Sequence, residues 1–290
     1  MSEVASAATQ RTVAFLRRFI KPHVQSLTAP ARVLQALLER LSPERRAPFA
    51  PQIPGDWLEA SGGAVATLFY LHGGAFLIGS PRLFRYAARE FARAGFDVFT
   101  PAYRLAPEHV FPAALEDVLR AYKTFAEARP GPFVIVGDSA GGGLAVSLML
   151  RIRDEGLPPP AAAALSSPWV DLAATGASIR ENEARDPWFT RKDILLGARA
   201  ALGRESARNP LASPIYADLS GLPPMLVHAG ADEALRDDST RLVARARQAG
   251  VDASLEMWPC VPHAWQLMSF LPEARESRAK AIEFLKARLV

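Results

Sequence analysis

The sequence predicts an α/β protein in which helices cover both faces of a mostly parallel β-sheet. From about Thr67 onward, strand-like segments alternate with helix-like segments of roughly 10–15 residues. Glycine or proline follows several of these segments, as at Gly95 and Pro101. Strands that alternate with helices of this length are typical of a sheet whose neighbouring strands run in the same direction.

The expected strands are short apolar segments that are rich in β-branched and aromatic residues. In chain order they cover residues 66–71, 96–100, 133–136, 161–165, 225–229 and 253–258. The expected helices lie between and after them, at residues 82–94, 113–128, 143–153, 239–249 and 273–288.

Two stretches fall outside this alternation. Residues 1–45 are expected to form two amphipathic helices, and residues 173–214 form a long insertion between two expected core strands. A long insertion after the carboxyl end of a strand usually lies over the ligand crevice. We therefore interpret both stretches as a helical cap on a core made of residues 46–172 and 215–290. The alternative is that they simply pack on an edge of the sheet.

The strand at 133–136 passes into the helix at 143–153 through a turn that contains Gly137, Ser139 and Gly141. In this Gly-x-Ser-x-Gly pattern the apex residue adopts a strained backbone conformation, and its side chain projects from the edge of the sheet. The amino terminus of the following helix lies beneath it. The pattern predicts that Ser139 is a nucleophile, although an ordinary turn with incidental glycines is the alternative. Asp138 could hold a neighbouring loop or belong to a local turn.

A serine nucleophile needs backbone N–H donors where negative charge develops on the substrate oxygen. The segment His72-Gly73-Gly74-Ala75 directly follows the strand at 66–71. Its adjacent glycines allow the backbone to turn and to point N–H groups into the crevice. The expected donors are Gly74 and Ala75, with Gly73 as a further candidate, together with Ala140 after the serine. His72 is expected to support this loop, and a glycine-rich turn that binds nothing is the alternative.

The serine also needs a general base, which among these residues would be a histidine. The chain has five histidines. His23, His72 and His109 precede the serine, and His228 lies inside an expected core strand. His263 is downstream of Ser139, in a loop directly after the strand at 253–258, and is therefore the expected base.

A carboxylate has to orient that base, and it is expected between the serine and the histidine in the chain. Asp232 follows the strand at 225–229, where the carboxyl end of a strand meets the crevice. We expect Asp232 to be the orienting acid and Glu233 to point the other way. Asp237 and Asp238 open the next helix and are better explained as its N-terminal caps.

Composition limits the remaining possibilities. The chain has 290 residues with 49% hydrophobic and 22% charged residues, which suits one large folded core. Its net charge of +4 comes from scattered arginines, so nucleic-acid binding is not expected. The single cysteine excludes an intramolecular disulfide, and no signal peptide or 18-residue apolar stretch is present. These features favour a cytoplasmic protein, and no metal-ligand or nucleotide motif indicates a metal or a cofactor.

Several sequence blocks together resemble the hormone-sensitive lipase family of α/β-hydrolases, in its bacterial carboxylesterase branch. The resemblance covers residues 65–290 and implies an α/β-hydrolase fold with an eight-stranded core and a helical cap. It also implies hydrolysis of carboxylic esters without a cofactor, with Ser139 as nucleophile, His263 as base and Asp232 as acid. The blocks are His72–Ala75, Tyr103–Glu108, Gly137–Gly142, Asp232 with Leu235–Asp238, and His263–Trp265.

The chain departs from the family pattern at Ala75, where the family usually has a third glycine. The N–H donor at this position survives if Ala75 does not have to adopt a positive φ, while its methyl group narrows the crevice near the acyl group. The N-terminal cap is also short, which argues against long acyl chains. We expect an apolar acyl site lined in part by cap residues, namely Phe15, Phe19, Trp188 and Phe189.

The expected substrate is thus a small ester with a short or medium acyl chain. The overall pattern also resembles acetyl-hydrolases and hydrolases of small lactones. An acyltransferase, a peptidase, or a non-catalytic binding protein on the same fold would also be compatible with these residues. The strand at 253–258 could form an exposed sheet edge that pairs with a second copy of the chain.

Overall fold

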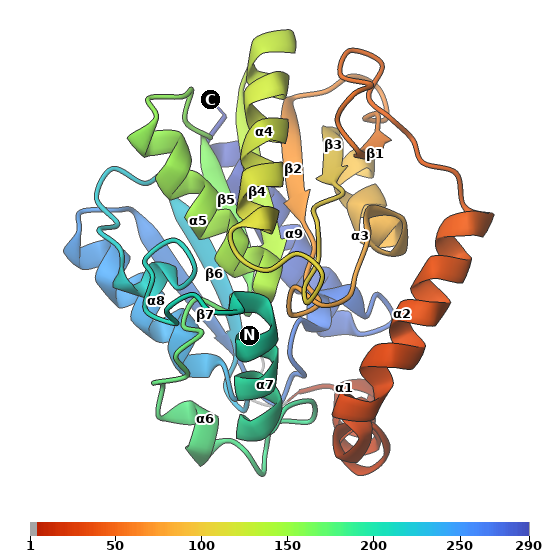
Figure 1. The fold of residues 1–290 in the computed structure, drawn as a ribbon, viewed down its shortest axis with the longest axis vertical. Helices are drawn as coiled ribbons and strands as arrows, with labels where there is room; N and C mark the ends of the chain where they lie inside the picture. The colour runs from red at the N-terminus through yellow and green to blue at the C-terminus, as the bar shows by residue number, and fades with distance from the viewer. Residues whose placement is uncertain (1–4, 290) are drawn as a thin grey trace.

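The computed structural model describes residues 5–289, apart from the side chains of Gln25, Leu27, Thr28, Leu34 and Leu38 in one helix. Its described residues contain one seven-stranded sheet in the order β1-β3-β2-β4-β5-β6-β7, in which only β1 runs antiparallel to its neighbour (Figure 1). The strands are β1 Gly55–Leu58, β2 Ala66–Leu71, β3 Phe96–Pro101, β4 Phe133–Asp138, β5 Ala162–Ser166, β6 Met225–Gly230 and β7 Ala253–Trp258.

The mostly parallel sheet is confirmed, and each of the six expected strands corresponds to one of β2–β7. The expectation of eight strands is wrong for the part of the chain that the structure describes, which has seven. The hydrophobic pattern did not reveal β1, because this strand has only four residues and contains an aspartate. Asp56 is buried there and forms an ion pair with Arg85, which belongs to a helix later in the chain. The distance from Arg85 Nε to Asp56 Oδ2 is 2.5 Å.

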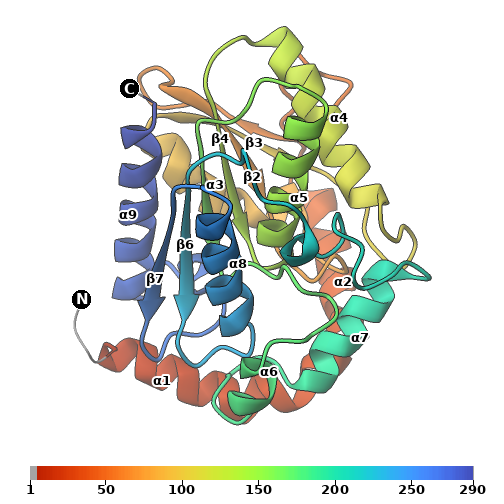
Figure 2. The same cartoon turned by 90° about the vertical axis from the view of Figure 1, so that its left-hand side faces the viewer.

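Helices cover both faces of the sheet, as Figure 2 shows edge-on. The side chains of β2 illustrate the two cores: Phe69 and Leu71 pack with α4 and α5, whereas Leu68 and Tyr70 pack with α3 and α9. The strand is buried on both faces, as expected for a central parallel strand. The helices of the core are α3 Pro81–Arg93, α4 Ala113–Ala128, α5 Ala140–Asp154, α8 Arg236–Gln248 and α9 Pro272–Ala287.

Two further groups of helices lie at the end of the sheet toward which the parallel strands point (Figures 1 and 2). The first group comprises α1 (Ala7–Phe15) and α2 (Val24–Leu41), joined by a π-helical and a 3₁₀ turn. The second comprises α6 (Ser178–Glu181) and α7 (Arg191–Leu202), inserted between β5 and β6. Both groups lie within the ranges assigned to a cap from the sequence, of which residues 1–4 are outside the described part.

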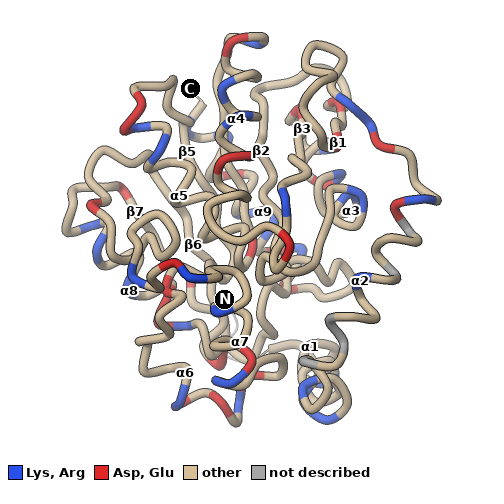
Figure 3. The backbone as a smooth tube through the Cα atoms, in the orientation of Figure 1, with Lys and Arg blue, Asp and Glu red and all other residues tan. Residues whose placement is uncertain are grey.

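The topology determines where reactive side chains collect. Parallel strands bring their carboxyl ends to one edge of the sheet, so the loops after β4, β6 and β7 converge beneath the helices of the second group. Lys and Arg are distributed over many elements, often beside Asp or Glu (Figure 3). In residues 5–289, no helix is both long enough and apolar enough to cross a membrane.

Candidate active site

Ser139 occupies a sharp turn between β4, which ends at Asp138, and α5, which begins at Ala140. Its φ and ψ are 54° and −124°, a strained conformation for a residue other than glycine. The flanking glycines are required by close approach: a Cβ on Gly141 would lie 2.0 Å from the carbonyl oxygen of Leu71. The N–H of Ser139 donates to the carbonyl oxygen of Ser166, which fixes the turn to β5.

His263 lies in the loop after β7 and contacts the serine directly. Its Nε2 is 2.8 Å from Ser139 Oγ, and its Nδ1 is 2.7 Å from Oε2 of Glu233. An ionised carboxylate can only accept hydrogen bonds, so Nδ1 carries the ring proton and Nε2 is free to accept from the serine hydroxyl. The three side chains therefore form one hydrogen-bonded relay, in which all three are at least nine-tenths buried.

The predicted acid, Asp232, is wrong: the carboxylate against the imidazole belongs to Glu233. The longer glutamate side chain folds back beneath its own loop, where Oε1 accepts from the N–H of Gly230 at 2.6 Å and from Ser167 Oγ at 2.7 Å. Asp232 is half-buried and lies beside the thiol of Cys260 instead. Burial, and then the charge of Asp232, raise the pKa of that thiol.

Chain order could not separate two adjacent acids in the same loop. The missed signal was Gly230, three residues before the glutamate. A Cβ at that position would lie 2.8 Å from Oε1 of Glu233, so only glycine leaves room for the folded-back side chain. Ser167, whose hydroxyl also accepts from the N–H of Ala264 at 3.2 Å, was missed as well.

The charges around His263 favour its protonated form. Burial is the largest single influence and acts to lower the pKa of His263. The hydrogen bond and the charge of Glu233, aided by Asp186 and Asp138, outweigh it, and the net result is a raised pKa. The ring of Phe189 packs edge-on against the imidazole, with centroids 5.1 Å apart.

The expected backbone donors differ in whether their N–H groups already have a partner. The N–H of Gly73 donates to Oδ2 of Asp138 at 3.0 Å, so Gly73 is already engaged and the expectation that it serves the substrate is wrong. Among residues 5–289, no hydrogen bond uses the N–H groups of Gly74, Ala75 or Ala140. These three groups therefore remain the candidate donors for an oxygen beside Ser139.

Ala75 differs from expectation in its backbone. Its φ is +55°, and that of Phe76 is +62°, so both residues adopt the left-handed conformation that favours glycine. The condition under which the Ala75 donor was expected to survive, a φ that is not positive, is therefore not met, yet this N–H has no hydrogen-bond partner among residues 5–289. The left-handed region costs an alanine roughly 1–2 kcal/mol relative to ordinary conformations, which the surrounding loop contacts have to offset.

Asp138 and His72 hold this loop in place. Asp138 accepts from Gly73 and, at 3.0 Å, from Tyr70 Oη. Burial raises the pKa of Asp138 to about 7, and the hydrogen bonds act in the opposite direction. His72 stacks between Tyr103 and Phe84, with ring centroids 4.3 and 5.1 Å away. Burial lowers the pKa of His72 to about 4, so this ring is neutral and lies where a supporting residue was expected.

A cavity of about 560 Å³ opens beside Ser139 and His263. Trp188 and Phe189 line it as expected, but Phe15 and Phe19 are not among its described lining residues. Those two rings are 55% and 53% exposed and pack on each other instead. The N-terminal segment contributes Val24 and Ala31 of α2. Other side chains that make the wall apolar are Leu77, Ile78, Ile194 and Leu196.

Similarity to known proteins agrees with this geometry. Residues 68–267 match a family model described as the alpha/beta hydrolase fold. A crystal structure of an esterase from the bacterial hormone-sensitive lipase family is 37% identical, with a TM-score of 0.86, and the match covers 99% of this chain and 100% of that chain. The chain belongs to the hormone-sensitive lipase family of α/β-hydrolases.

Two further similar proteins carry names or titles that mention a reaction or a ligand. An acetyl-hydrolase of Streptomyces hygroscopicus is 40% identical over 235 residues, which cover 80% of this chain and 79% of the relative. The structure of EstE5, soaked with p-nitrophenyl butyrate, is 33% identical with a TM-score of 0.86, and covers 98% of this chain and 99% of that one.

Proposed function

We propose that this member of the hormone-sensitive lipase family is a serine carboxylesterase that works through an acyl-enzyme on Ser139. Its relatives are named esterases, carboxylesterases and acetyl-hydrolases, and the chain is an ester hydrolase. The observation that carries the assignment of roles is the relay from Ser139 Oγ through His263 to Glu233, with contacts of 2.8 and 2.7 Å. Glu233 replaces Asp232 in this proposal as the residue that orients the base.

In the first half of the cycle, His263 Nε2 takes the hydroxyl proton while Ser139 Oγ bonds to the ester carbonyl carbon. The negative charge that develops on the carbonyl oxygen is stabilised by the free N–H groups of Gly74, Ala75 and Ala140. The carbon–oxygen bond to the alcohol then breaks, and the alcohol leaves with the proton from His263.

In the second half, His263 takes a proton from water, whose oxygen attacks the acyl carbon. The bond to Ser139 breaks, the serine recovers its proton from His263, and the carboxylic acid is released. Glu233 keeps the ring in the tautomer that both halves need and stabilises the imidazolium between them.

The cavity supports an apolar acyl group of short or medium length. A cavity of about 560 Å³ is in the range of ligand pockets for small molecules, and its wall is largely apolar. Ala75 adds a methyl group at the point where the acyl group would enter. Acetyl esters are a second substrate candidate, because the relative from Streptomyces hygroscopicus is named an acetyl-hydrolase.

The test is a panel of p-nitrophenyl esters from acetate to palmitate, together with small lactones, assayed with wild type and with Ser139→Ala. We expect the highest kcat/KM on short or medium acyl chains. We also expect no turnover above background in Ser139→Ala, with an unchanged far-UV circular dichroism spectrum. Turnover near the wild-type level in that variant would refute the assignment of the nucleophile.

A homodimer through β7 is a further part of the proposal. This strand is the last of the described sheet, next to β6 alone. Its outer backbone groups beyond the carbonyl of Ala253, which accepts from Arg247 Nε, have no strand beside them and could pair with a second chain. Light scattering on purified protein tests it: a dimer that dissociates on introduction of a proline at Leu255 supports pairing through this edge, and a monomeric wild type contradicts it.

A further inference from the structure

Asp186 is a buried carboxylate in the cap insertion that the catalytic cycle does not use. Its side chain is fully buried. Oδ2 accepts from the N–H of Ala234 at 2.6 Å, directly after Glu233 in the chain. Oδ1 accepts from the N–H groups of Trp188 and Phe189, at 2.7 and 2.9 Å. One carboxylate therefore joins the loop that carries the acid to the segment that lines the cavity and packs on His263.

Asn182 contacts the same loop from a neighbouring position. It is fully buried, and its Nδ2 donates to the carbonyl oxygens of Ala231 and Glu233, at 3.0 and 2.9 Å. Together with Asp186, it makes three hydrogen bonds to the main chain of residues 231–234. Lys21 of the N-terminal segment in turn donates to the carbonyl oxygen of Asp186, at 2.7 Å.

We propose that Asp186 and Asn182 are positioning residues that hold the Glu233 carboxylate in line with His263 and attach the cap to the catalytic relay. This proposal rests on the role of Glu233 assigned above. The distance from Glu233 Oε2 to His263 depends on where the main chain of residues 231–234 lies. Three bonds from the insertion fix that main chain, while Gly230 and Ser167 fix the other carboxylate oxygen. The cap thus acts on catalysis as well as covering the substrate.

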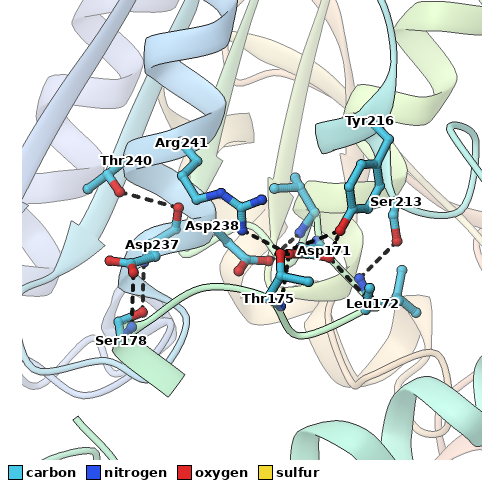
Figure 4. A network of polar contacts seen from close by, with 12 residues as sticks. Asp171, Leu172, Thr175, Ser178, Ser213, Tyr216, Asp237, Asp238, Thr240 and Arg241 are labelled. Carbon is cyan, nitrogen blue, oxygen red and sulfur yellow. Dashed lines mark hydrogen bonds and ion pairs between the residues drawn. The ribbon is translucent and has the colours of Figure 1, made fainter. Parts of the chain in front are cut away.

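A second attachment between the insertion and the core provides a comparison (Figure 4). There Asp171, which is also fully buried, accepts from Thr175, Tyr216 and Arg241. The described contacts of Asp171 do not include loop 231–234 or the segment 188–189. Removing the Asp171 carboxylate therefore tests the attachment of the insertion alone. Removing the Asp186 carboxylate should also displace the Glu233 side chain.

The decisive variant is Asp186→Asn. In the described part of the chain, the hydrogen bonds to the two Asp186 side-chain oxygens all come from backbone N–H groups. The NH₂ group of an asparagine would therefore have to face another donor on one side. We expect kcat on p-nitrophenyl butyrate to fall about tenfold or more, because small displacements of catalytic groups are costly, and KM to change much less. The acid limb of the kcat/KM profile should also move to lower pH, since the charge of Asp186 contributes to raising the pKa of His263.

Asn182→Ala separates position from charge. It removes two bonds to the loop without changing any charge, so kcat should fall while the acid limb stays near the wild-type pH. Asp171→Asn is the matched control, because it makes the same carboxylate-to-amide change among donors in the other attachment. Its kcat and acid limb should stay close to wild type even if its melting temperature falls. Tyr216→Phe, which removes one of these donors, serves if Asp171→Asn does not fold.

A folded Asp186→Asn with kcat within twofold of wild type and an unmoved acid limb would overturn the proposal. If that variant does not fold, a normal kcat in Asn182→Ala would do so. Glu233→Gln is assayed in parallel to keep the two proposals apart. If Glu233→Gln is active, the assignment of Glu233 as the acid is wrong. If Glu233→Gln is inactive while Asp186→Asn has normal activity, only the proposed positioning role of Asp186 is wrong.

Discussion

Replacing Glu233 by glutamine tests the relay at the position where sequence and structure disagree. The shape of the side chain is kept, and its surroundings determine how the amide has to lie. Gly230 and Ser167 both donate to the Oε1 position, so the amide oxygen belongs there. The amide NH₂ then faces His263 Nδ1 and donates to it.

The consequence for His263 is a change of tautomer. With Nδ1 accepting, the ring proton moves to Nε2, which lies 2.8 Å from Ser139 Oγ. An N–H at that position cannot take the hydroxyl proton, so the base is lost while the fold is retained. A wrong tautomer of this kind lowers kcat by about 10⁴-fold in a serine protease. That loss corresponds to about 5.4 kcal/mol of transition-state stabilisation.

The assay is steady-state hydrolysis of p-nitrophenyl butyrate by Glu233→Gln and by Asp232→Asn. Asp232→Asn is the matched control, since the same chemical change is made one residue earlier, at a half-buried side chain beside Cys260. We expect it to stay within about threefold of wild type, as is usual for a change away from the reacting groups. Loss of activity in Asp232→Asn together with a normal Glu233→Gln would refute the reasoning.

Three further predictions concern the same site. The base has to be neutral to accept a proton, and the pKa of His263 is raised above its ordinary value of 6.5. The acid limb of the kcat/KM profile should therefore have its midpoint above pH 6.5. A midpoint below that pH would contradict the electrostatic account. Gly73→Ala places a Cβ 2.3 Å from Asp138 Oδ2, so the loop after β2 that carries the candidate N–H donors has to move. We expect kcat to fall about 100-fold in steady-state assays. An unchanged kcat would show that the position of this loop is not needed for catalysis. Gly197→Ala in α7 places a Cβ 3.4 Å from the Trp169 ring and 3.9 Å from Ala75 Cβ, which are ordinary contact distances. Thermal or urea unfolding should therefore show a gain of up to about 1 kcal/mol in the free energy of unfolding, and a loss would mean that the site is overpacked.

The sequence predicted the fold well wherever hydrophobic pattern and chain order determine it. Buried parallel strands such as β2 and β4 form continuous apolar runs, and these are visible without any knowledge of the fold. Strand β1 is different, because the Asp56 carboxylate is buried inside it in an ion pair with Arg85, 29 residues later in the chain. No local pattern shows that pairing.

Within the site, the same distinction separates what could be predicted from what could not. Ser139 is marked by its glycines, and His263 by its place after the last strand. The choice between Asp232 and Glu233 depends on the direction of a loop backbone, which the contacts of Gly230 and Ser167 determine. Gly73 is a reasonable donor candidate from the sequence, but in the structure its N–H donates to Asp138.

The N-terminal helical segment shows a further limit of periodicity. The spacing of Phe15 and Phe19 predicts an apolar stripe on a helix, but it does not say what the stripe faces. In the structure these rings pack on each other and are exposed to solvent, while Val24 and Ala31 reach the cavity from the next helix. Which of these side chains line the cavity depends on how the N-terminal helices are placed relative to one another.

The central claim is that Ser139 is the activated nucleophile of this site, and covalent labelling tests it most directly. The protein is titrated with diethyl p-nitrophenyl phosphate, and the fraction labelled is measured by intact-protein mass spectrometry alongside residual esterase activity. We predict one diethylphosphoryl group per chain, located on Ser139 by peptide mapping, with activity lost in proportion to labelling. Complete inactivation without a label at Ser139, or a full label there with activity retained, would contradict the account.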